Sequence, residues 1–68
     1  RYLSNEPRED RDTFVAAAMD IDSIYLTARL DIALRMLTRS TDADLAAWAS
    51  EMLTNTVRPA FLRHAQDH

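Results

Sequence analysis

Residues 8–38, REDRDTFVAAAMDIDSIYLTARLDIALRMLT, decide the fold, because this stretch contains neither glycine nor proline. Alanine, leucine, arginine and methionine, which are good helix formers, recur throughout it. The stretch therefore predicts one long helix of about 45 Å, at a rise of about 1.5 Å per residue. Its only weak point is Asp20-Ile21-Asp22-Ser23, where a new N-cap would break the helix into two.

This predicted helix has two adjacent apolar faces, whereas a surface helix normally has a single stripe about 100° wide. One face, which we assign to the core of the chain, consists of Val15, Met19, Leu26, Leu30, Ala33 and Leu37. The other face consists of Phe14, Ala18, Ile21, Ile24, Tyr25, Ala28, Ile32 and Met36, and all of these residues except Ala18 make up the predicted oligomer interface. A helix that is apolar over so much of its circumference is typical of the interior of an assembly.

Two shorter helices are predicted after this stretch. The segment Ser40-Thr41-Asp42 is a turn followed by a helix start, and Ser40 or Thr41 is the expected N-cap of a helix over residues 42–56. Trp48 is expected to anchor that helix in the core, beside Leu26, Leu30 and Leu37. Pro59 lacks a backbone N–H and disfavours helix at the residue before it, so a separate third helix is expected over residues 59–66.

Residues 1–7 are expected to be an extended N-terminal lead-in, because Pro7 suits the first turn of a helix. Residues 8–68 are expected to form a single all-helical domain. The predicted fold class is therefore all-α, with a long first helix and two shorter ones that form a helical hairpin. This hairpin is expected to assemble into a dimeric helical bundle.

The expectation of a homodimer rests on helix lengths. The second and third helices would span only roughly 22 Å and 12 Å, so they can cover one face of the long helix but not both. The uncovered face would expose several hundred square ångströms of apolar surface, more than soluble monomers usually expose. The alternative is a compact three-helix monomer in which the first helix is broken at Asp20–Ser23.

Composition limits the compartment and the partners. The chain has no cysteine, which excludes disulfides and thiolate metal sites and suits a reducing, cytoplasmic location. No stretch approaches the roughly 20 apolar residues of a membrane span, so no membrane partner is expected. The formal net charge is −3, which makes nucleic acid an unlikely partner.

Few residues in the sequence are candidates for catalysis or metal binding. His64 and His68 have the spacing of a helical zinc pair, but the accompanying glutamate is missing and a solvated C-terminal turn is the preferred interpretation. The three Asp-x-Asp pairs do not converge, because helical residues two apart point in different directions. We therefore predict no catalytic, cofactor-binding or metal-binding residues, and no enzymatic activity.

The preferred functional hypothesis is a non-enzymatic protein–protein interaction module that associates with itself and has a regulatory or adaptor role. A different protein is a second possible partner. One alternative is a dimeric DNA-binding regulator, in which residues 42–64 form a helix-turn-helix with Arg58 and Arg63 facing the DNA. Another is a structural or docking segment of a larger protein, which would fit the start of the chain at Arg1.

Overall fold

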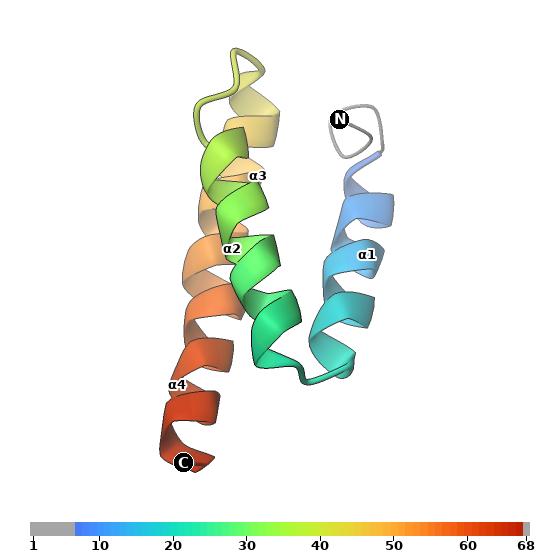
Figure 1. The fold of residues 1–68 in the computed structure, drawn as a ribbon. Coiled ribbons are helices and arrows are strands. Elements are labelled where there is room, and N and C mark those ends of the chain that lie inside the picture. The colour runs from blue at the N-terminus through green and yellow to red at the C-terminus, as the bar shows by residue number, and fades with distance from the viewer. Residues whose placement is uncertain (1–6, 68) are drawn as a thin grey trace.

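The computed structural model describes residues 7–67, which are helical apart from Pro7 and the connecting turns. Helices α1 (Arg8–Asp20) and α2 (Ile24–Leu37) are followed by a long helical segment made of α3 (Ala43–Met52), η2 (Leu53–Val57) and α4 (Arg58–Asp67). Figure 1 shows α2 running antiparallel to both α1 and the long segment, and α4 extending beyond the corner between α1 and α2. The all-α class is confirmed, with no strand among the described residues.

The single long helix predicted over residues 8–38 is wrong, because the chain reverses direction between α1 and α2. Asp22 has a φ of 57°, in the left-handed region, which a right-handed helix cannot include. Ser23 then caps α2, since its Oγ accepts a hydrogen bond from the backbone N–H of Leu26 at 3.3 Å. The break falls at the weak point that the sequence contains, and it lets α1 fold back onto α2.

The predicted separation between helices 42–56 and 59–66 is also wrong, because the helix continues through Pro59. The segment before the proline is a π-helix, in which the N–H of Arg58 donates to the carbonyl of Leu53, five residues back. In an ordinary α-helix a proline ring clashes with the carbonyl four residues before it. We attribute the continuity to the wider π-turn, which accommodates the ring and lets α4 follow α3 without a break.

The N-cap of α3 is Asp42, and not Ser40 or Thr41 as predicted. Its Oδ1 accepts hydrogen bonds from the backbone N–H groups of Asp44 at 3.1 Å and Leu45 at 3.3 Å. Ser40 supports this cap from the turn, since its Oγ accepts the N–H of Asp42 at 3.1 Å. The carboxylate therefore has a structural role at a helix N-terminus, where negative charge is favoured.

The core lies where α1 and α2 meet the long helical segment. Its most buried large side chains are Trp48, Leu34, Leu45, Val15 and Val57. Trp48 is buried, as predicted, in the same cluster as Leu30, and Leu26 and Leu37 are partly buried against that cluster. No helix in residues 7–67 combines the length and the apolar character that crossing a membrane requires.

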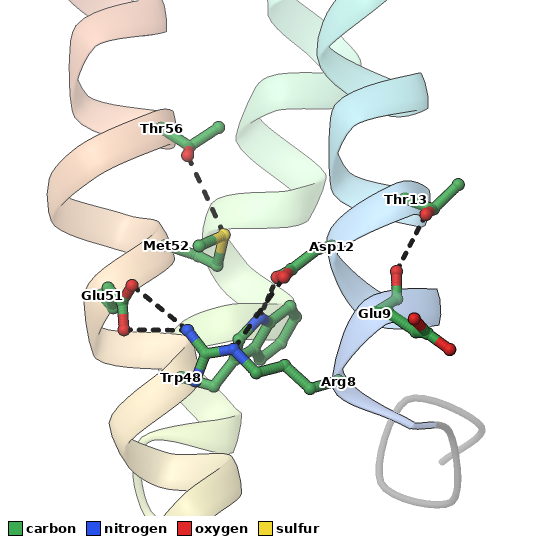
Figure 2. A network of polar contacts seen from close by, with 8 residues as sticks. All are labelled: Arg8, Glu9, Asp12, Thr13, Trp48, Glu51, Met52 and Thr56. Atoms are coloured by element: carbon green, nitrogen blue, oxygen red, sulfur yellow. Dashed lines mark hydrogen bonds and ion pairs between the residues drawn. The ribbon is translucent and has the colours of Figure 1, made fainter.

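A polar network attaches α1 to α3 at one side of this core (Figure 2). The indole Nε1 of Trp48 donates a 2.7 Å hydrogen bond to Oδ1 of Asp12, and the guanidinium of Arg11 lies 4.9 Å from the centre of the Trp48 ring. Arg8 donates from one nitrogen to both carboxylate oxygens of Glu51, each at 3.2 Å. These contacts satisfy the only polar atom of the buried indole and fix α1 against α3.

Candidate functional site

The main candidate site is an apolar stripe on the outer face of α2, which we define as Tyr25, Ala28, Ile32 and Met36. At about 100° per residue these four positions fall within about 80° of one another, so they share one face of the helix. Tyr25 is 82%, Met36 70% and Ile32 61% exposed, and Ala28 is partly buried. Large apolar side chains thus line a helix face that no other part of residues 7–67 covers.

The opposite face of α2 anchors the stripe. Leu30 and Leu34 are buried in the core, and Thr27 beside them is also buried. Thr27 would be an unsatisfied polar group there, but its Oγ1 donates to the carbonyl of Ser23 at 2.9 Å. Because α2 is held from its inner side, its outer face is presented on a fixed helix and not on a loop.

The other three predicted interface residues lie outside the stripe. Ile21 is at the end of α1, Ile24 begins α2 and Phe14 lies on α1, and all three are exposed. Ile21 and Ile24 flank Asp22, so the reversal of the chain places both near the corner between the two helices. The structure thus exposes six of the seven predicted interface residues, Ala28 being the partly buried one. That these side chains form an interface stays a prediction.

Charged residues border the stripe on both sides. Arg29 is exposed along one edge. Along the other edge, Nε of Arg35 lies 2.9 Å from Oδ2 of Asp31, an ion pair one helical turn apart. An apolar strip between charged edges is the usual arrangement of a protein–protein contact, where charge is depleted at the centre and present at the rim.

A second candidate surface is a groove between α2 and the long helical segment, with a volume of about 510 Å³. Its walls carry three charged residues, Asp31, Arg35 and Arg58, and two hydroxyls, those of Ser50 and Thr54. The apolar lining residues are Leu53, Val57, Phe61 and Leu62. Sequence reasoning missed this groove, because it depends on the π-turn and on a continuous α3–α4 segment, both of which the sequence interpretation replaced with a break at Pro59.

The side chain of His64 is largely buried, although the sequence predicts a solvated C-terminal turn here. Its side chain is only 15% exposed, and its Nε2 lies 3.6 Å from Oδ1 of Asp22 at the corner between α1 and α2. His68 lies outside the described residues. Residues 7–67 contain no cluster of three or more side chains of the types that hold metal ions. His64 is therefore best understood as a contact between α4 and that corner.

Comparisons with known proteins assign neither a family nor a relative. No family model matches the chain, and no curated protein and no solved structure is significantly similar to it. Its function therefore has to be inferred from the two surfaces described above.

Proposed function

We propose that this protein is a non-enzymatic helical interaction module that associates with itself through the stripe on α2. The observation that carries the proposal is the exposure of Tyr25, Ile32 and Met36 along one face of a helix whose other face is fixed in the core. A contiguous apolar surface of several hundred square ångströms is at the upper limit for soluble monomers and marks a contact site. A second copy of the chain is the simplest occupant, because such a surface is complementary to itself across a two-fold axis.

The expected affinity follows from the apolar area. Burying about 500 Å² at about 25 cal/mol per Å² would contribute roughly 12 kcal/mol before the cost of association. That cost is about 4 kcal/mol or more, which leaves at most about 8 kcal/mol, the value that corresponds to a Kd near 1 µM. The interface is small, so we expect a reversible dimer in the micromolar range and not an obligate one.

The composition of the stripe favours a close approach of two helices. Ala28 lies between the larger side chains of Tyr25 and Ile32, and a small residue at this point lets the opposite helix come near. Tyr25 can bury its ring while its hydroxyl stays at the wet rim. The charged edges formed by Arg29 and by the Asp31–Arg35 pair would remain at the border of the contact, where they contribute to orientation more than to affinity.

The biological role that we propose for the dimer is regulatory or adaptor work. Packing α2 against its copy would leave α4 and the groove beside it accessible in each protomer. A dimer of this kind would present two identical binding surfaces at once, so that a ligand with two matching epitopes would bind with avidity.

Site-specific cross-linking tests this proposal directly, because the natural chain has no cysteine. In an Ala28→Cys variant, a short bis-maleimide reagent should convert most of the protein to a covalent dimer at about 50 µM, a concentration well above the expected Kd. The matched control is Ala47→Cys, on an exposed position of α3 outside the stripe. Since Ala47 is more exposed than Ala28, the control thiol has the better access to reagent.

The two variants give opposite expectations on a denaturing gel. Dimer should dominate for Ala28→Cys and stay a minor band for Ala47→Cys. Equal cross-linking of the two variants would mean random collision, and preferential cross-linking of Ala47→Cys would place the contact on another face of the molecule. Either result would contradict an interface on α2.

A further inference from the structure

The groove between α2 and the long helical segment contains none of the four stripe residues, although Asp31 and Arg35 both line the groove and border the stripe. On α3, Trp48 and Glu51 face α1, since Trp48 bonds to Asp12 and Glu51 to Arg8. Ser50 lines the groove and lies two residues from Trp48, a separation that on a helix points side chains in roughly opposite directions. The α2–α3 pair therefore has α1 packed along one side and the groove along the other.

The shape of the groove fits a helix better than a small molecule. It is bordered by two antiparallel helices and lined from Ser50 to Leu62, a length of about 18 Å or roughly three helical turns. Its lining includes Leu53, Phe61 and the 56% exposed side chain of Leu62. An amphipathic helix laid along such a groove would bury its apolar face and complete a four-helix bundle with α1, α2 and the long segment.

The charge of the groove sets the charge of its ligand. The guanidinium of Arg58 makes no hydrogen bond or ion pair with any residue in the described part of the chain. Arg35 is paired with Asp31, but its side chain is still 71% exposed. With two arginines and one aspartate the groove has a charge of +1 (2 − 1), in a chain whose net charge is −3.

From these observations we infer that the groove binds an acidic amphipathic helix of a partner protein. The apolar positions of that helix lie over Leu53, Phe61 and Leu62, and a glutamate or aspartate at its edge pairs with Arg58. A second acidic residue reaches the exposed side of the Arg35 guanidinium. The planar guanidinium groups suit this contact, because they can hold a carboxylate with two parallel hydrogen bonds.

The test uses two labelled peptides and the full chain. Each peptide is a helix of about 14 residues with leucine at positions 1, 4, 8 and 11, following the i, i+3, i+7 pattern of groove-binding helices. Glutamate flanks the leucines in one peptide and lysine replaces every glutamate in the other. Fluorescence anisotropy should show that the acidic peptide binds at least about tenfold more tightly than the lysine peptide, with a difference that shrinks at high salt.

The variant Arg58→Glu should weaken binding of the acidic peptide by about tenfold or more, since it replaces an attractive contact with a repulsive one. The control is Arg63→Glu, which makes the same charge change at an exposed position of α4 outside the groove. That control should change the Kd by no more than about twofold. Circular dichroism melts should match wild type for both variants, because both arginines are exposed.

Four results would overturn the inference. Failure of both peptides to bind would exclude a helix-binding groove, and equal effects of the two arginine variants would show a long-range charge effect only. Loss of peptide binding in an Ile32→Glu variant would place the peptide on the α2 stripe instead. Loss of self-association in Arg58→Glu would make a second copy of this chain the occupant of the groove.

Discussion

Replacing Trp48 with alanine is expected to lower the free energy of unfolding by about 3–5 kcal/mol. The indole is fully buried at the centre of the core, in the same cluster as Leu34 and Leu45. Removing it leaves a cavity, and also leaves Asp12 without the indole donor and Arg11 without the ring it covers. Small domains are stable by only about 5–15 kcal/mol, so the loss is a large share of the total.

Urea unfolding monitored by far-ultraviolet circular dichroism measures this effect. It should be recorded at one fixed protein concentration, because self-association would couple stability to concentration. The control is Trp48→Phe, which keeps an aromatic ring but cannot donate to Oδ1 of Asp12, and it should cost less, about 1–3 kcal/mol. A loss below about 1 kcal/mol for Trp48→Ala would show that this residue does not hold the core together.

Replacing Ile32 with glutamate is expected to abolish self-association. Ile32 is central in the stripe and 61% exposed in the single chain, so a charge there is well solvated in the monomer. In the proposed dimer the two glutamates would be desolvated close to each other across the two-fold axis, at a cost of several kcal/mol. The Kd should therefore rise by about a hundredfold or more, while the helical content stays at the wild-type level.

Light scattering coupled to size exclusion compares this variant with a control of equal side-chain charge. Ala47→Glu also adds a glutamate to an exposed helical position, but on α3 and outside the stripe. We expect the control to associate like the wild type and Ile32→Glu to elute as a monomer. If both variants associate as the wild type does, the stripe is not the contact surface.

The sequence predicted the helical class and the main apolar surfaces because these depend on local pattern. The face with Val15, Leu26 and Leu30 was correctly assigned to the core. Thr27 and Leu34 are also buried, although neither belonged to a predicted apolar face. Thr27 is polar, and only the folded chain shows that its hydroxyl is satisfied by the carbonyl of Ser23.

The two errors in the chain path have the same origin, since both depend on choices of backbone conformation that the side-chain pattern does not determine. Asp22 could continue a helix or adopt a left-handed conformation, and the gain from folding α1 onto α2 favours the second. Pro59 could end a helix or continue it after a π-turn, and the burial of Val57 and Ala60 on either side favours continuation. Packing thus overrides local propensity at both points.

Because of these errors, the original reason for expecting a dimer no longer holds. The stripe on α2, which would form the dimer interface, is nevertheless exposed. Homodimerisation was inferred from a long first helix that two short helices could not cover. In the structure that helix is two helices, and the longest helical segment is Ala43–Asp67. The stripe remains exposed because α1 and the long segment both pack against the inner side of α2, and neither reaches Tyr25 or Ile32 on its outer side.

Sedimentation velocity of the unmodified chain tests the central claim, self-association through α2, most directly. Over roughly 1–100 µM, a range that brackets the expected Kd, the weight-average sedimentation coefficient should rise with concentration. It should approach the value for a dimer, with twice the 7.8 kDa mass of the monomer. A coefficient that stays at the monomer value throughout this range would contradict the account.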